Sequence, residues 1–278
     1  MVHDKETTTI LNRYGLADLK NEEITSLIHD LKKISINANT GEECDSTSKS
    51  AVNVHVSNHP LLAHKVSILR SSSTIPHAFR SVLREITFHL GYEAMSSLTT
   101  RPVNITVPNS TDHVSFVGKK ISERITLIPI LRSGLGMSDA MLELVPNAGV
   151  HHIGMYKSHN MPVQYYNRLP KICEYDVAFV IDPVMATAQT MMSVLGIMKK
   201  WGVPKIHVVT VIASKIAIKT ISEAHPDIKI TVGEIDDAID DAGCLLPGLG
   251  DAGDRIFGTH VEDNEEALMH VSKRKKSI

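Results

Sequence analysis

The chain has 278 residues, of which 42% are hydrophobic and 22% charged, an ordinary globular composition long enough for one large domain or two small ones. A net charge of −2 excludes a global field that favours nucleic acid or an anionic membrane, so an anionic substrate has to be held by local positive groups. The cysteines Cys44, Cys173 and Cys244 are too far apart for a disulfide framework or a metal motif, and they fit a reducing compartment.

The sequence has no run of about 20 apolar residues, the length needed to span a bilayer. Residues 1–10 are polar and lack the apolar core of a secretory signal. We therefore expect a cytoplasmic protein without a membrane partner. The basic residues 272–278 predict a solvated tail, and they leave nuclear targeting open as a second reading.

The first 55 residues differ in composition from the rest. Apolar residues recur there at roughly helical spacing, which predicts one amphipathic helix, and residues 37–49 have the composition of a linker. The apolar residues are Leu16, Leu19, Leu27, Ile28 and Leu31. We read residues 1–55 as an N-terminal appendage that packs on the main domain or on a partner, 56–262 as the main domain, and 263–278 as a basic tail.

Strands and helices alternate from about residue 121 onward. Apolar runs predict strands at 125–130, 150–156, 177–181, 206–213 and 228–232, and the segments 135–145, 190–200 and 215–225 read as helices. Continuous apolar strands that alternate with helices predict a parallel sheet covered on both faces. Ligands of such sheets bind beyond the carboxyl ends of the strands, here after Ile130, Tyr156, Ile181 and Ala213.

The loop after the strand 177–181 is a candidate phosphate site. Residues 182–190 join that strand to the start of a helix, where backbone N–H groups converge and the helix dipole favours an anion. Thr187 and Thr190 add hydroxyl donors, and Asp182 offers a carboxylate to sugar hydroxyls. Taken alone, the segment also fits a simple capped helix after a buried strand.

Residues 180–187 read Val-Ile-Asp-Pro-Val-Met-Ala-Thr and resemble the phosphoribosyl pyrophosphate (PRPP) loop of type I phosphoribosyltransferases. Pro183 stands where related families carry a second acid, which is the uracil phosphoribosyltransferase form. Three further stretches are similar to that family in order and spacing, and together the matches span about residues 59–260. They are the N-terminal signature in 59–86, the pyrophosphate loop in 129–137 and the uracil motif in 247–259.

The resemblance implies an α/β type I phosphoribosyltransferase fold. Its parts are a parallel sheet core flanked by helices, a small hood made from N- and C-terminal segments, and a projecting β-hairpin arm. We place the arm at residues 157–170. The family resemblance implies that this arm also makes dimer contacts. A homodimer or a dimer-based tetramer is implied in the same way.

The implied reaction converts uracil and PRPP to UMP and pyrophosphate. By resemblance, the catalytic residues are Arg132, Asp182 and Asp251. The residues implied to bind PRPP are Arg132, Lys157, Asp182, Pro183, Val184, Met185, Ala186, Thr187, Ala188, Gln189, Thr190 and Asp251. Leu245, Gly250, Asp251 and Ala252 are implied to bind uracil, mostly through the main chain.

Magnesium is implied as a passenger of PRPP, since Mg²⁺ keeps its waters and uses phosphate oxygens rather than a protein cage. We expect no dense set of protein ligands. His151 and His152 are adjacent on a predicted strand and point to opposite faces, so they do not chelate together. Some relatives respond to GTP, which makes GTP a candidate effector.

Several residues differ from the family pattern. The phosphate loop has Ala188 and Gln189 where the family commonly has two glycines, and we expect Gln189 to adopt a left-handed backbone at a cost of roughly 1–2 kcal/mol. Replacing Gln189 with Gly is then expected to improve PRPP affinity. Lys157 replaces Arg, Cys244 replaces Tyr and Ser133 replaces Ala.

These differences keep two alternatives open. One is a weakened or inactive homologue that binds uracil or a nucleotide as a regulator or assembly partner. The other is a phosphoribosyltransferase for a different base, which requires changes in residues 245–254. A nucleic-acid partner is not expected, because no basic stripe with aromatic residues is present.

Overall fold

The computed structural model describes residues 53–109, 113–158 and 161–259. The N-terminal appendage and the basic tail predicted from the sequence lie outside these residues, apart from residues 53–55. The helices are α3 (Pro60–Arg70), α4 (Pro76–Met95), α5 (Leu135–Leu144), α6 (Gln189–Trp201), α7 (Lys215–Ala224) and α8 (Ala252–Phe257). The strands are β1 (Val54–Val56), β2 (Thr100–Pro108), β3 (His113–Ile121), β4 (Ile125–Leu131), β5 (Gly149–Val150), β6 (Ile153–Ser158), β7 (Met161–Asn167), β8 (Val177–Ile181), β9 (Val184–Met185), β10 (Lys205–Ser214), β11 (Lys229–Asp236), β12 (Ala238–Ile239) and β13 (Leu245–Leu246).

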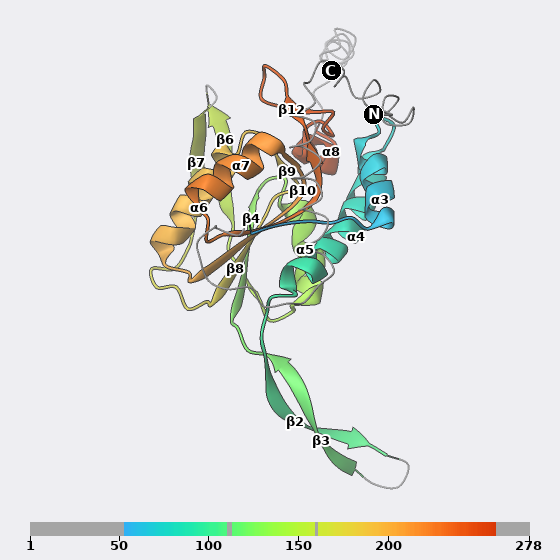
Figure 1. The fold of residues 1–278 in the computed structure, drawn as a ribbon, viewed down its shortest axis with the longest axis vertical. Helices are drawn as coiled ribbons and strands as arrows, with labels where there is room; N and C mark the ends of the chain where they lie inside the picture. The colour runs from blue at the N-terminus through green and yellow to red at the C-terminus, as the bar shows by residue number, and fades with distance from the viewer. Residues whose placement is uncertain (1–52, 110–112, 159–160, 260–278) are drawn as a thin grey trace, which may run out of the picture. The chain divides into compact units, whose positions relative to one another are not determined.

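A largely parallel sheet forms the centre of the described residues (Figure 1). Its strands follow the order β1-β11-β10-β8-β4-β6-β7, with β5 paired to β4 and β9 paired to β10. All of these pairs are parallel except β6 with β7, which is antiparallel. The prediction of a parallel sheet with alternating helices is therefore confirmed.

Two hydrophobic clusters cover the two faces of the sheet. Along β8, Val177, Phe179 and Ile181 join the cluster that includes side chains of α3, α4, α5 and α8. Their neighbours Ala178 and Val180 join the cluster with side chains of α6 and α7. Alternate residues of a strand point to opposite faces, so burial on both sides accounts for the uninterrupted apolar run.

The predicted boundaries of the core elements agree closely with the structure. The strand at 177–181 is β8, and the segments 135–145, 190–200 and 215–225 are α5, α6 and α7. The strand expected at 150–156 is instead divided into β5 and β6. Residues 157–170 contain the end of β6 and all of β7, which form a hairpin at one edge of the central sheet.

A second hairpin extends away from the central sheet (Figure 1). It is a separate two-stranded sheet of β2 and β3, paired without interruption from Thr100 with Ile121 to Pro108 with His113. Almost all of its residues are exposed, including Phe116 and Val117 at 57% and 61%. No sequence pattern predicted this hairpin.

Candidate active site

The loops after β4 and β8 meet at one edge of the sheet. These strands are parallel neighbours, with Pro129 paired to Ile181, so their carboxyl ends lie side by side. Gly134 makes the close approach possible, because a Cβ built on it would lie 2.5 Å from the carbonyl oxygen of Ile181. The peptide bond between Leu131 and Arg132 in this loop is cis.

Asp182 is buried where β8 ends. Its carboxylate accepts a hydrogen bond from Ser133 Oγ at 2.6 Å and another from the N–H of Val184. Burial raises the pKa of Asp182 to about 7, although the bonds from Ser133 and Val184 act in the opposite direction. The nearby carboxylate of Asp251 raises the pKa further, since two negative charges repel.

The predicted phosphate loop leads directly into α6. Ala188 is the residue before the helix, and Gln189 is its first residue. The strand β10 supports the loop from the side, because Ser214 Oγ donates to the carbonyl oxygen of Ala186 at 2.5 Å. The same hydroxyl accepts from the N–H of Ala217, so one serine joins the loop to the start of α7.

The backbone strain expected at Gln189 lies at Ala188 instead. Ala188 has φ of 64° and ψ of −13°, the left-handed conformation, and its side chain is only 3% exposed. Gln189 begins the helix with an exposed side chain. The expectation for Gln189 was wrong because the helix starts one residue earlier than the sequence suggested, so the turn falls on the residue before it.

The C-terminal motif contacts the loop after β4. Asp251 caps the short helix α8 by accepting from the N–H of Asp254 at 2.9 Å. Arg132 pairs with the carboxylate of Asp254 at 2.9 Å, and its side chain is 54% exposed. Gly253 lies between Asp251 and Arg132, since a Cβ there would be 3.1 Å from Asp251 Oδ1 and 3.6 Å from an Arg132 nitrogen. The structure thus brings together the three residues predicted to be catalytic.

The loop predicted to bind uracil is held by residues that were not predicted to belong to the site. Arg70 donates to the carbonyl oxygen of Gly248 at 2.9 Å and to Asp236 at 2.6 and 3.1 Å. Asp236 in turn accepts from the N–H of Gly248 at 2.9 Å. Arg255 donates to the carbonyl oxygens of Leu69, Leu249 and Ser71.

These bonds tie the loop before α8 to the end of α3. They form the contact between N- and C-terminal segments that a small hood requires. A sequence signal for Arg70 existed, because it belongs to the N-terminal signature, but Asp236 gave none. Its partner Arg70 is distant in the sequence, and only the fold brings the two together.

Other predicted residues have fewer links to this region. Leu245 is buried in the core cluster, Gly250 has φ of 78°, and Ala252 is buried at the start of α8. Cys244 is exposed, and its N–H donates to Asp240. Lys157 is exposed on β6, opposite Pro162, and no described contact joins it to Arg132 or Asp182.

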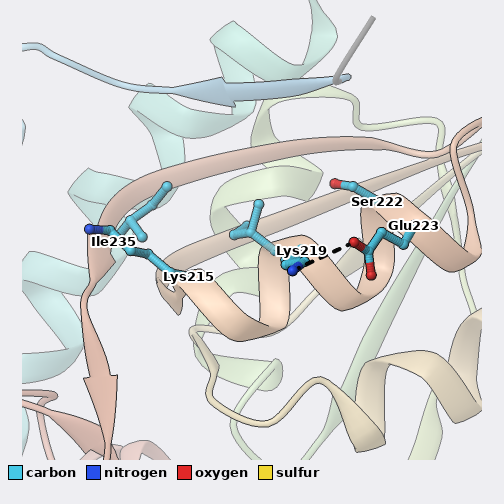
Figure 2. Close-up of a pocket in the computed structure, with 6 residues that line it drawn as sticks. Lys215, Lys219, Ser222, Glu223 and Ile235 are labelled. Atoms are coloured by element: carbon cyan, nitrogen blue, oxygen red, sulfur yellow. Dashed lines mark ion pairs between the residues drawn. The ribbon is translucent and has the colours of Figure 1, made fainter. Parts of the chain in front are cut away.

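A pocket of about 320 Å³ lies elsewhere, beside α7 and β11 (Figure 2). It is lined by Lys215, Ile218, Lys219, Ser222, Glu223 and Ile235. Its lysines are paired, Lys219 with Glu223 and Lys215 with Asp237. The pocket includes none of the predicted site residues.

In the described ranges, no group of His, Cys, Asp and Glu side chains is arranged to hold a metal ion. None of the helices in these ranges combines the length and the apolar character that a membrane span needs.

Comparison with known proteins identifies the family. Residues 56–259 match the family profile described as uracil phosphoribosyltransferase. The uracil phosphoribosyltransferase of Roseiflexus castenholzii is 42% identical over 74% of this chain and 98% of its own length. The protein of that name from Listeria innocua is 38% identical over 74% of this chain and 99% of its own length.

The chain belongs to the uracil phosphoribosyltransferase family. Among solved structures, the AQ2163 protein from Aquifex aeolicus is similar, with a TM-score of 0.68 and 32% identity over 75% of this chain and 99% of that one. The predicted family and the type I phosphoribosyltransferase fold are confirmed. The region matched to uracil phosphoribosyltransferases contains every residue of the candidate site.

Proposed function

We propose that the chain is a uracil phosphoribosyltransferase, a pentosyltransferase of pyrimidine salvage that makes UMP and pyrophosphate from uracil and PRPP. In this reaction the bond from C1′ to the pyrophosphate oxygen breaks, and a bond from C1′ to N1 of uracil forms as N1 loses its proton. The observation that carries the proposal is the meeting of Arg132, Asp182 and Asp251, from three separate segments, at one edge of the sheet.

The loop from Asp182 to Thr190 binds the ribose 5-phosphate. Its backbone N–H groups and the first turn of α6 favour an anion, and the hydroxyls of Thr187 and Thr190 add donors. Asp182 accepts hydrogen bonds from the ribose hydroxyls. The remaining residues assigned to this loop are Pro183, Val184, Met185, Ala186, Ala188 and Gln189.

Arg132 stabilises the pyrophosphate as it leaves. A fixed cation aimed at a developing negative charge is an effective way to lower a barrier of this kind. Lys157 adds a second positive charge from β6, without the two-point grip of an arginine. Mg²⁺ arrives with PRPP, and the exposed carboxylate of Asp251 interacts with PRPP or with the waters of that ion.

Uracil is read by main-chain groups around Leu245, Gly250 and Ala252. Arg70 and Asp236 support this assignment, because they fix the backbone at Gly248 from both its N–H and its carbonyl oxygen. A fixed set of donors and acceptors discriminates against cytosine, whose amino group stands where uracil has an acceptor. The mismatch leaves a buried donor without a partner, which costs affinity.

A product assay tests this function. The full chain is incubated with uracil, PRPP and magnesium, with and without GTP, and UMP is measured. We expect UMP to form. Absence of UMP with uracil or nucleotide binding still present in calorimetry would favour the regulator, and turnover of hypoxanthine or guanine would favour an enzyme for another base.

Two variants test the site within that assay. Arg132→Ala is expected to lower kcat/KM for PRPP by about 10²–10³-fold. Asp251→Asn keeps a residue that caps α8 well, so a loss of turnover in this variant reports the missing charge. Unfolding curves serve as the control. They should change little, since the Arg132–Asp254 pair is half-exposed and such pairs contribute up to about 1 kcal/mol. Wild-type turnover in both variants would refute the assignments.

We also propose a cytoplasmic homodimer or tetramer, with residues 1–55 as an appendage and 263–278 as a tail. The sparse cysteines support the compartment. The exposed apolar side chains of the β2–β3 hairpin support the assembly, because an isolated two-stranded hairpin is marginally stable in water. GTP is the candidate effector.

A further inference from the structure

Ser133 connects the two loops that form the candidate active site. It lies between Arg132 and Gly134 in the loop after β4 and is half-buried. Its hydroxyl donates to Asp182 Oδ1 at 2.6 Å, across 49 positions of sequence. A serine hydroxyl has one hydrogen to donate, so this bond uses the whole donor capacity of the side chain.

The surroundings of Asp182 make this bond important. The carboxylate faces Ser133 from the loop after β4, the N–H of Val184 from β9 and the carboxylate of Asp251 from the α8 cap. Within residues 53–109, 113–158 and 161–259, no Lys or Arg forms an ion pair with it. Among the described residues, two hydrogen bonds therefore stabilise its ionised form, and of these only the bond from Ser133 comes from a side chain.

We infer that Ser133 is a positioning residue that fixes the Asp182 carboxylate toward the ribose hydroxyls of PRPP. Its hydrogen bond also joins the pyrophosphate loop (residues 129–137) to the phosphate loop (residues 182–190). The bonds from Ser133 and Val184 use two of the roughly four lone-pair positions of the carboxylate, and the remaining ones can accept from the sugar hydroxyls. Because Ser133 follows Arg132 directly, the same contact also sets how the guanidinium-bearing loop lies relative to the ribose site. That the group bound by Asp182 is the ribose of PRPP rests on the proposed function.

Removing the Ser133 hydroxyl should change the pH at which Asp182 loses its proton, an effect that lost packing alone does not cause. Loss of the hydroxyl removes a bond that favours the ionised carboxylate, so Asp182 in Ser133→Ala should hold its proton to a higher pH. If the ionised form binds PRPP, the acidic limb of the pH profile of kcat/KM for PRPP should move upward by about half to one pH unit.

The experiment compares four full-length proteins over pH 5.5–9. Ser133→Ala should show the shifted limb, and Ser133→Thr, which retains a hydroxyl, should restore the wild-type profile. Ser138→Ala is the matched control, since Ser138 donates to the carbonyl oxygen of Gly134 in the same region and has no bond to Asp182. Superimposable profiles for wild type and Ser133→Ala would overturn the inference.

A second measurement separates this inference from the proposed function. The ¹³C resonance of the Asp182 carboxyl group is titrated in the ligand-free chain and assigned with Asp182→Asn. A higher midpoint in Ser133→Ala supports the contact even if the wild-type protein makes no UMP. Equal midpoints would disprove it whatever the activity.

Discussion

The left-handed backbone of Ala188 is a local cost at the start of α6. Its φ of 64° places the Cβ close to backbone atoms, and glycine avoids this penalty. We predict that Ala188→Gly raises the unfolding free energy by about 1 kcal/mol. Gln189→Gly should lower it by up to about 1 kcal/mol, because glycine is a poorer helix former than glutamine and position 189 is the first residue of α6. Urea unfolding of both variants tests the assignment, and a stabilising Gln189→Gly with a destabilising Ala188→Gly would contradict it.

Asp182 should make the stability of the ligand-free protein depend on pH. Its folded pKa of about 7 exceeds the unfolded value of about 3.9, so the folded state binds the proton more tightly between these values. The stabilising contribution is fully present below pH 4 and is lost as the pH rises through 7. Relative to wild type, Asp182→Asn should therefore gain on the order of 2 kcal/mol in unfolding free energy between pH 5 and pH 8. Urea unfolding of both proteins at pH 5 and pH 8 measures this gain. An equal difference between variant and wild type at the two pH values would contradict the prediction.

At the scale of elements, the loop before α8 depends on the contact between Arg70 and Asp236. Asp236 is only 4% exposed, and breaking a buried pair costs about 3–5 kcal/mol. We predict that Asp236→Asn lowers the unfolding free energy by several kcal/mol and raises KM for uracil more than KM for PRPP. Asp237→Asn is the adjacent control, because its exposed pair with Lys215 should contribute less than about 1 kcal/mol. Equal losses in the two variants would contradict this role.

The elements of the core could be predicted from sequence, whereas their cross-connections could not. Apolar runs such as 177–181 predict a buried strand because a strand covered on both faces has no exposed positions. The β2–β3 hairpin lacked this signal, since nearly every residue of it is exposed. Motif resemblance pointed to Arg132, Asp182 and Asp251. Sequence gave no sign that Ser133 contacts Asp182, because that bond depends on two neighbouring strands ending together.

At the scale of the whole molecule, the β2–β3 hairpin should determine assembly. Phe116 and Val117 expose apolar surface that a partner chain would cover. We predict that wild-type protein is dimeric or tetrameric in light scattering and that the double variant Phe116→Ser, Val117→Ser is smaller. Lys120→Ser on the same strand is the control and should keep the wild-type mass. A monomeric wild-type protein would exclude this role.

The contact of Gly134 with the end of β8 makes substitution tolerance very uneven along the chain. Any larger residue at position 134 would push a carbon atom into the carbonyl oxygen of Ile181 and separate the two strand ends. Gly196, on α6, has open space where its side chain would be, so it can accept Ala at little steric cost. In a saturation library, almost every substitution at position 134 should therefore be lost, whereas many at position 196 should be retained. Variants of this protein are better designed on α6 than in the turn at the end of β4.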